Sequence, residues 1–190
     1  MNWLVSGVSS SGKSSYISSC SFKDVCGFVP NDQNVLLAYQ LGSFNVINDN
    51  SVVHYNICRS IQKKYKFSLK YQLKRRLGLK PINYQIDDPI LENVEAVDLQ
   101  VIILIVTKDE LLRRINKRQN VETESWTSIN VEGYDRKYWL RFYQEVDLYH
   151  LYNSWLSNLE EKGLKYTLLD STDRNYKQIY SKGYLKEFLR

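Results

Sequence analysis

Eight residues near the amino terminus read Gly7-Val8-Ser9-Ser10-Ser11-Gly12-Lys13-Ser14, and they follow directly on the apolar run Trp3-Leu4-Val5. They satisfy the pattern G-x-x-x-x-G-K-[ST], known as the Walker A motif. A short strand, a glycine-rich turn and the start of a helix therefore succeed one another in the order that anion binding requires. The sequence predicts a phosphate-binding loop, followed by a helix over residues 13–19.

Each residue type in the motif has its own physical part. Gly7 and Gly12 allow backbone conformations that other residues avoid, so that consecutive N–H groups can point inward at phosphate oxygens. Lys13 supplies a positive charge between the outer phosphates, and the Ser14 hydroxyl is placed to ligate Mg²⁺. The residues predicted to bind nucleotide are Gly7, Ser9, Ser10, Ser11, Gly12, Lys13, Ser14 and Ser15. The alternative is a serine-rich capped helix that binds no anion.

Length and composition are those of one intracellular domain. The chain has 190 residues, of which 43% are apolar, so one domain with a sizeable core is expected over residues 1–190. The longest aliphatic run, 101–106, is too short to span a bilayer, and a loop that begins at Gly7 leaves no room for a signal peptide. We expect a cytoplasmic monomer or homodimer. The three cysteines show no metal-ligand spacing and are expected to be free thiols.

Positive charge is concentrated in one segment. The formal net charge of +5 favours anionic ligands. Residues 59–77 carry eight Lys and Arg residues and no acidic residue, and apolar side chains recur there at every fourth position. This pattern predicts a basic helix that Gly78 and Pro81 end, with one apolar face made of Ile61, Tyr65, Leu69, Leu73 and Leu77. A surface helix with solvated lysines explains the same pattern without any ligand.

Short apolar runs alternate with helical periodicity along the chain. Five strands are predicted at residues 3–5, 25–29, 52–57, 101–106 and 166–169, with a polar turn at 42–51. The run at 101–106 is typical of a central parallel strand buried on both faces. Helices are predicted at 13–19, 33–41, 59–77, 109–117 and 134–162, the last ended by Gly163, with a final helix through Ile179, Tyr180 and Phe188. This order indicates a three-layer α/β/α sandwich with a five-stranded parallel sheet.

With this loop and this order of elements, the chain resembles the P-loop small-molecule kinases. That family includes nucleotide, nucleoside, shikimate and gluconate kinases and the kinase domain of polynucleotide kinases. The resemblance covers most of the chain as a plan, and its specific sequence match is the loop at residues 7–14. It implies a nucleotide-kinase-like fold, ATP or GTP as phosphoryl donor, and Mg²⁺ as cofactor.

In that family the helix after the fourth strand leads into a lid, whose arginines close over the phosphoryl groups. The resemblance places a lid at about 113–133, with Arg113, Arg114 and Arg118 as the matching arginines. Arg114 and Arg118 share a helical face and are the candidate catalytic residues beside Lys13, whereas Arg113 points elsewhere and is assigned to nucleotide binding. The loop 119–133 would close to exclude water. The alternative is a solvated basic helix face.

Further positions are carried over from the family in the same way. Asp32 lies just past the second predicted strand, where several of these kinases place an acid that orients the acceptor; a turn-forming Asp is the alternative. The predicted third strand, 52–57, lacks the Asp that many P-loop proteins use to hold Mg²⁺ through water, so Asn56 is the candidate substitute. The turn after the fifth strand is the candidate base contact, with Asp170, Ser171 and Thr172.

The residues favour an ATP-dependent kinase that transfers the γ-phosphoryl group to a small, anionic acceptor, such as a nucleotide, nucleoside, sugar or polynucleotide end. The alternative is a nucleotide-gated protein without kinase activity that binds nucleic acid or another anionic surface through residues 59–77. A sulfotransferase shares the sheet and a phosphate loop, but it usually lacks the ending seen at Gly12-Lys13-Ser14. It is therefore disfavoured.

Overall fold

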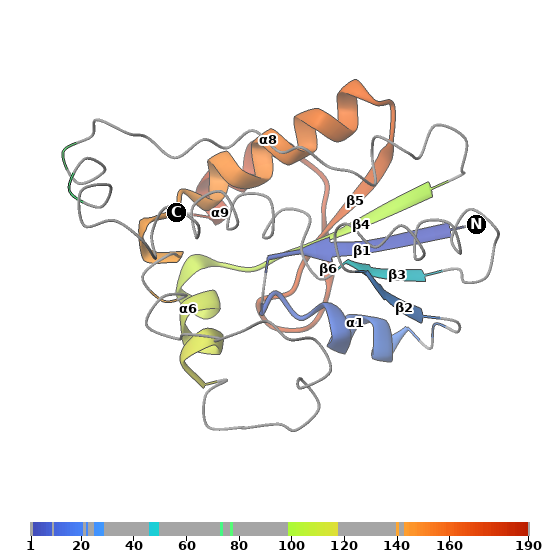
Figure 1. Cartoon of the computed structure of the whole chain (residues 1–190), viewed down its shortest axis with the longest axis horizontal. Helices are drawn as coiled ribbons and strands as arrows, with labels where there is room; N and C mark the ends of the chain where they lie inside the picture. The colour runs from blue at the N-terminus through green and yellow to red at the C-terminus, as the bar shows by residue number, and fades with distance from the viewer. Residues whose placement is uncertain are drawn as a thin grey trace.

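The described part of the chain contains both strands and helices (Figure 1). The computed structural model describes residues 2–8, 10–20, 22, 25–28, 46–49, 73, 77, 99–117, 140 and 143–189. Its elements are β1 (Asn2–Gly7), α1 (Lys13–Ser19), β2 (Val25–Phe28), β3 (Val46–Asp49), β4 (Leu99–Ile105), α6 (Lys108–Lys117), α8 (Leu148–Glu161), β5 (Lys165–Asp170), β6 (Lys177–Ile179), the 3₁₀ helix η3 (Lys182–Tyr184) and α9 (Leu185–Phe188).

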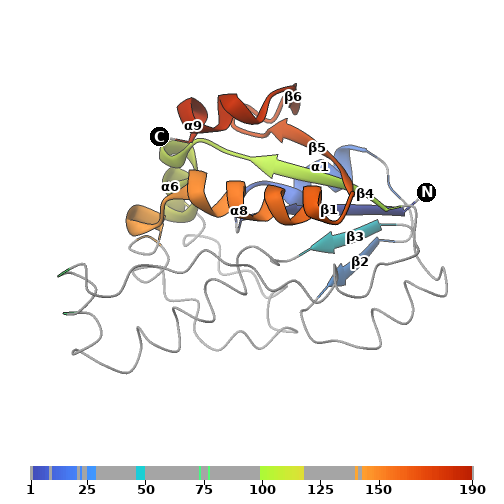
Figure 2. The ribbon, with the colours of Figure 1, turned by 90° about the horizontal axis from the view of Figure 1, so that it is seen from above.

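The strands form one sheet in the order β2-β3-β1-β4-β5-β6 (Figure 2). β1 is paired in parallel with β3 on one side and with β4 on the other. β2 runs parallel to β3, and β5 runs parallel to β4. β6 runs antiparallel to β5, with Leu168 opposite Ile179. The described residues therefore form a mixed sheet of six strands.

The prediction of a five-stranded, all-parallel sheet is wrong. After β5 the chain does not continue into a helix through Ile179; residues 177–179 turn back and pair antiparallel with β5 before η3 and α9 begin. A short turn is enough to join an antiparallel pair, whereas a parallel strand needs a long crossover connection. β6 carries no sequence signal of a strand, since Ile179 is the one apolar residue in Lys177–Ile179.

The third strand also differs from its prediction. β3 occupies Val46–Asp49, within the segment 42–51 that the sequence pattern indicates as a polar turn. Val46 lies opposite Trp3 of β1 and opposite Val25 of β2, so β3 is paired on both sides. This pairing satisfies the backbone groups of a four-residue run of which only two residues are apolar. The predicted strand at 52–57 and the predicted helix at 33–41 lie outside the described residues.

The long helix predicted at 134–162 is interrupted. Residues 143–145 are helical, Val146 and Asp147 are not, and α8 then begins at Leu148. The Asp147 side chain accepts a hydrogen bond from the backbone N–H of His150 at 3.0 Å, the arrangement of an N-cap, which starts a new helix. The predicted stop at Gly163 is confirmed, because Gly163 has φ 66° and its N–H donates to the Glu160 carbonyl at 3.0 Å.

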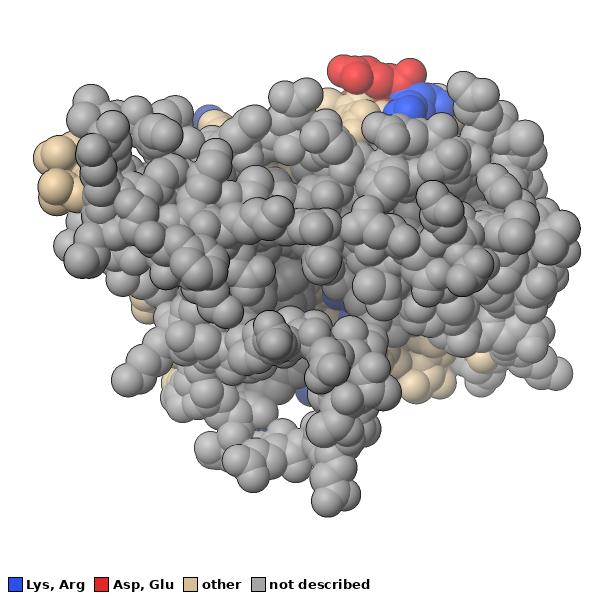
Figure 3. All heavy atoms as spheres, viewed as in Figure 1, with Lys and Arg blue, Asp and Glu red and all other residues tan. Residues whose placement is uncertain are grey.

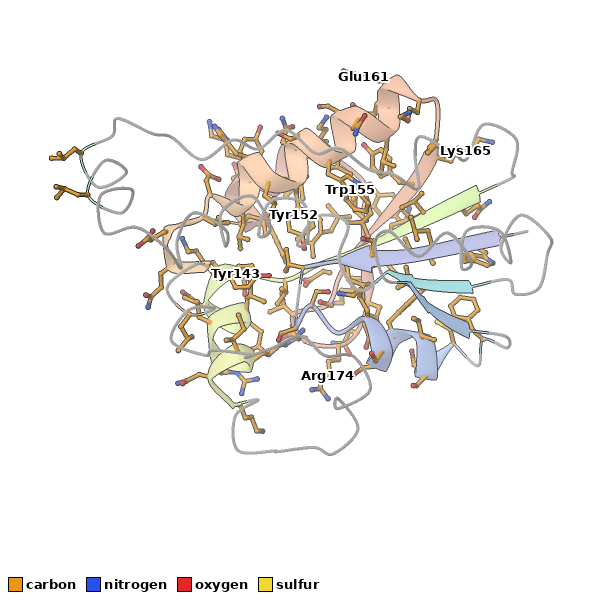
Figure 4. All side chains as sticks on the ribbon, viewed as in Figure 1. Tyr143, Tyr152, Trp155, Glu161, Lys165 and Arg174 are labelled. Atoms are coloured by element: carbon orange, nitrogen blue, oxygen red, sulfur yellow. The ribbon has the colours of Figure 1, made fainter. Side chains whose placement is uncertain are left out.

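Helices cover both faces of the central strands, with α8 and α1 on opposite sides (Figure 1). Residues 101–106 are at most 4% exposed, which confirms the prediction of a central buried strand. Their side chains alternate, so that Ile103 packs with α8 while Leu104 packs with Ile17 of α1. Figure 4 shows Tyr152 and Trp155 of α8 pointing toward the strands.

The outer surface of α8 is charged at its carboxyl end. Figure 3 shows acidic and basic side chains side by side there, where Glu160, Glu161 and Lys162 are exposed. Glu160 is joined to η3 by an ion pair with Lys182 at 2.9 Å. Within the described ranges, no helix has the length and hydrophobicity to cross a bilayer.

Candidate functional site

The phosphate loop (residues 7–14) leaves the carboxyl end of β1 and enters α1. In the sheet, β3 and β2 lie on one side of β1, and β4 and β5 lie on the other side. The chain passes through β2 and β3 first and crosses to β4 afterwards, so the connections diverge at β1. In open α/β sheets, ligands bind outside the carboxyl ends of the strands at the point where connections diverge in this way. The loop therefore lies where a ligand is expected.

Both glycines of the loop are required by its backbone. Gly7 has φ 149°, and a Cβ atom on it would lie 2.6 Å from the carbonyl oxygen of Leu104 and 2.6 Å from Ser11 Oγ. Gly12 has φ 100°, in a region that side-chained residues rarely adopt. A side chain at Gly7 would have to displace the backbone of β4. The glycine spacing of the motif thus reflects a loop that closes tightly on the ends of two strands.

Lys13 is folded back over the loop. Its Nζ donates to the carbonyl oxygens of Gly7 at 2.9 Å and Val8 at 3.2 Å, and the residue is 8% exposed. These bonds hold the ammonium group against the loop rather than in solvent. Lys13 therefore places a positive charge beside the loop backbone.

The first turn of α1 presents backbone donors next to that charge. α1 begins at Lys13 without a side-chain cap, and the N–H of Tyr16 donates to the carbonyl of Gly12 at 3.0 Å. The N–H groups that precede Tyr16 have no carbonyl acceptor within the helix, which is the general property of a helix start. Ser14 and Ser15, which follow Lys13, are exposed. The first turn of α1 thus carries backbone donors and exposed hydroxyl groups next to Lys13.

The carbonyl side of the loop is held by Arg114 of α6. Its Nη1 donates to the carbonyl oxygens of Ser10 at 3.4 Å and Ser11 at 3.1 Å. Its Nη2 donates to the carbonyl oxygens of Ser171 at 2.5 Å and Thr172 at 2.9 Å, in the turn after β5. The structure therefore places this predicted lid residue behind the phosphate loop, between two loops of the protein.

Glu110 anchors the arginine pair of α6. Its carboxylate accepts from Arg114 Nε at 2.8 Å and from Arg113 Nε at 2.5 Å. These hydrogen bonds lower the pKa of Glu110 to about 2, and the bond from Arg113 has the largest effect. The two arginines differ in setting, because the Arg113 side chain is 64% exposed and that of Arg114 is 11% exposed. Arg113 is thus the one that faces solvent.

The turn after β5 is brought against the loop, as the predicted base contact requires. Ser171 Oγ lies 2.6 Å from the Ser11 carbonyl oxygen and 3.0 Å from the Ile105 carbonyl oxygen. The hydroxyl has one proton, which these two acceptors share. The N–H of Thr172 donates to Asp170 Oδ1 at 2.7 Å, which fixes the start of the turn. Asp170, Ser171 and Thr172 are therefore close to the phosphate loop.

Tyr152 of α8 lies within the helix predicted at 134–162 and has no predicted part in the site. In the structure its hydroxyl donates to the Leu104 carbonyl at 3.0 Å and accepts from the N–H of Val8 at 3.2 Å. Complete burial raises the pKa of the Tyr152 hydroxyl, so it stays protonated and can donate. It fixes the first residue of the loop after β1. A tyrosine at a core position is the available signal, because its hydroxyl needs a partner there.

Asp49 is a second residue that sequence reasoning missed. It is the last residue of β3, one position beyond the pair formed by Asn48 and Val5 of β1. An acid therefore stands at the carboxyl end of the strand beside β1, the place for which the predicted strand at 52–57 offers only His54 and Asn56. The signal lies in the order of residues in Val46–Asp49, two aliphatic residues followed by Asn and Asp.

Several predicted site residues lie outside the described part of the chain. They are Ser9, Asp32, Asn56, Arg118 and the loop 119–133. Two residues of the predicted basic helix are described: the N–H of Leu77 donates to the Leu73 carbonyl at 3.0 Å, a helical spacing, and both side chains are exposed. Within the described ranges, no group of His, Cys, Asp and Glu side chains is arranged to hold a metal ion by itself.

Models of known protein families and curated protein sequences were compared with the chain, and none of them matches it. The chemistry of the site therefore follows from its own residues and their geometry.

Proposed function

We propose that the chain is an ATP-dependent phosphotransferase, a P-loop kinase that transfers the γ-phosphoryl group to a small, anionic acceptor. The observation that carries the proposal is the phosphate loop itself. Gly7 and Gly12 have positive φ angles, as a loop with inward N–H groups would require, and Lys13 is held over the loop. This combination of backbone donors and a fixed cation suits the outer phosphates of a nucleoside triphosphate.

Mg²⁺ supplies charge neutralisation at the β- and γ-phosphates when it is bound. Ser14 and Asp49 are the residues that we assign to it. Both carry oxygen ligands, which Mg²⁺ prefers; Ser14 is exposed next to Lys13, and Asp49 ends the strand beside β1. Mg²⁺ usually keeps several water molecules, so a site with two protein oxygens fits its chemistry.

The nucleoside is proposed to lie along the turn after β5. Asp170, Ser171 and Thr172 are held next to the phosphate loop. Further along this segment, Arg174 and Tyr176 have φ angles of 58° and 48°, which residues with side chains adopt at some energetic cost. Such strain is often found where a loop is shaped to meet a ligand.

An anionic acceptor is favoured by charge. The net charge is +5, and residues 59–77 add positive charge without any acid. Asp32 is proposed to orient the acceptor, and Arg118 with the loop 119–133 to close over the transferred group. The proposal includes a cytoplasmic location, where ATP and Mg²⁺ are available.

The test is consumption of ATP by the purified protein with Mg²⁺, scanned over nucleosides, nucleotides, sugars, sugar phosphates and 5′-hydroxyl oligonucleotides. We expect one acceptor class to stimulate turnover. Lys13→Ala should abolish that turnover, because the loop loses its fixed cation. Lys162→Ala, at an exposed position beyond α8, is the matched control and should behave as the unmodified protein does.

Two results would contradict the proposal. If Lys13→Ala binds and hydrolyses ATP as the unmodified protein does, the phosphate-loop assignment is wrong. If ATP binds but no acceptor stimulates turnover, the chain is better described as the nucleotide-gated binding protein. Salt-sensitive binding of DNA or RNA would then identify its ligand.

A further inference from the structure

Arg114 uses its whole guanidinium group on the protein. Five hydrogen bonds leave its Nε, Nη1 and Nη2 atoms, which equals the number of N–H groups that an arginine has. The acceptors are Glu110 on its own helix, two carbonyl groups of the phosphate loop and two carbonyl groups of the turn after β5. All three guanidinium nitrogens of Arg114 are thus directed at acceptors of the protein.

The bonds from Arg114 to the loop affect the peptide unit between Ser11 and Gly12, on the side proposed to bind an anion. The Ser11 carbonyl accepts from both Arg114 and Ser171. Since a trans peptide unit holds its C=O and N–H groups in opposite directions, the N–H of Gly12 points away from Arg114. A cation behind the carbonyl also polarises that peptide unit and makes its N–H a stronger donor. Arg114 thus orients a donor of the loop without touching the ligand.

The same arginine ties the loop to the neighbouring turn. Ser171 and Thr172 offer Arg114 their carbonyl oxygens, and Thr172 Oγ1 accepts from the N–H of Thr107 at the end of β4. Arg114 therefore joins the loop after β1 to the turn after β5, and Thr172 joins that turn to the segment after β4. Lysine cannot reproduce this, because a point charge lacks the planar arrangement of five donors.

We propose that Arg114 is a positioning residue that holds the phosphate loop in its anion-binding shape by clamping its carbonyl side to the turn after β5. The inference rests on the proposed nucleotide binding and assigns Arg114 a different part from the lid arginine that the family resemblance implies. Ser171 is the second donor to the same carbonyl group and supports the clamp.

The experiment measures Kd values for ATP and for inorganic tripolyphosphate, both with Mg²⁺, together with the Tm of each variant. Arg114→Met removes the clamp, Arg114→Lys keeps the charge alone, and Ser171→Ala removes the second donor. Lys108→Met is the matched control: Lys108 lies on the same helix and donates to the carbonyls of Gln144 and Val146, away from the loop. All Kd values are measured at a temperature where each variant is folded.

Arg114→Met should weaken binding of both ligands by about tenfold or more, the scale of a charge-assisted hydrogen bond. Arg114→Lys should restore little of the loss, and Ser171→Ala should show a smaller loss in the same direction. Lys108→Met should lower Tm and leave both Kd values unchanged. If Arg114→Met fails to fold, Arg114→Lys and Ser171→Ala carry the same comparison.

Three results would overturn the inference. A lower Tm with unchanged Kd values would show that Arg114 only stabilises the fold. A loss confined to ATP would show that Arg114 contacts the nucleoside. A fall in kcat with unchanged Kd values would return Arg114 to the lid role. Failure of the proposed function looks different, because the unmodified protein would then bind tripolyphosphate no better than Lys13→Ala does.

Discussion

The face of the sheet covered by α8 is packed differently from the face covered by α1. On the α8 side, buried residues come from β1, β4, β5, α6, α8 and α9, and they include the fully buried Tyr152 and Trp155. On the α1 side, the described buried residues are Val5, Ile17, Ile102, Leu104 and Leu169.

Half-buried aromatic side chains surround this smaller cluster. They include Tyr16 and Tyr176, whose ring centroids are 4.9 Å apart. Among the described residues, the α8 side thus has the larger set of buried apolar side chains. The phosphate loop, which precedes α1, is held by hydrogen bonds that Arg114 and Ser171 donate to Ser11 and that Tyr152 accepts from Val8.

The largest effect is expected from Trp155→Ala, on the α8 side. Removing a fully buried indole leaves a cavity and should lower the free energy of unfolding by about 3–5 kcal/mol. Urea denaturation followed by circular dichroism measures the change. A loss no larger than that caused by Ile17→Ala would contradict the contrast between the two faces.

Ile17→Ala tests the α1 side directly. Ile17 is the buried apolar residue of α1 and is 7% exposed, so the loss of unfolding free energy should be near the lower end for such changes, about 2 kcal/mol. Because α1 carries the phosphate loop, the affinity for ATP should fall as well. Leu159→Ala, on α8, is the control: it should destabilise the protein while its folded form binds ATP normally. If Ile17→Ala and Leu159→Ala lowered ATP affinity equally, the packing on the two faces would not differ in its effect on the phosphate loop.

Tyr152→Phe tests the hydrogen bond between α8 and the start of the phosphate loop. It keeps the ring on the α8 side and removes the hydroxyl that receives the N–H of Val8. Unfolding free energy should fall by about 1–2 kcal/mol, since a buried donor loses its acceptor. The Kd for tripolyphosphate should rise, as calorimetry can show. A change in stability with an unaltered Kd would mean that this hydroxyl does not shape the loop.

The smallest effect on stability is expected from Glu110→Gln, which alters the acceptor of Arg114 on α6. The pKa of Glu110 is about 2, below its ordinary range, so its charged form stabilises the folded state. This contribution is complete above the unfolded pKa of about 4.3 and is lost as the pH falls toward the folded pKa. The variant should therefore lose less stability on acidification between those two pKa values. A pH profile identical to that of the unmodified protein would rule out the linkage.

Features encoded by neighbouring residues were predicted well. The loop glycines, the aliphatic strand at 101–106 and the stop at Gly163 are confirmed because each depends on a local pattern. β3 and β6 were missed because neither has a strong apolar signal, and each exists through pairing with distant strands.

The site was predicted only in part for the same reason. Lys13 is identified by its motif, but the contacts of Arg114 and Tyr152 depend on groups about a hundred or more residues away, such as Ser11 and Val8. No spacing rule in the sequence reveals that an arginine on α6 faces carbonyl groups. The break at Asp147 was missed because the apolar period continues through it, while the capping side chain signals a new start.

The antiparallel β6 also determines how the sheet ends. Without β6, the strand β5, with its buried Leu168 and Leu169, would form the edge and offer a row of backbone groups to other chains. β6 pairs with the last three residues of β5. At this position the edge of the sheet is therefore the three-residue β6, in which Lys177 and Gln178 are exposed. Short edges that carry lysine are poor templates for strand addition. The hairpin therefore removes the most apolar half of β5 from the edge at which another chain could add a strand.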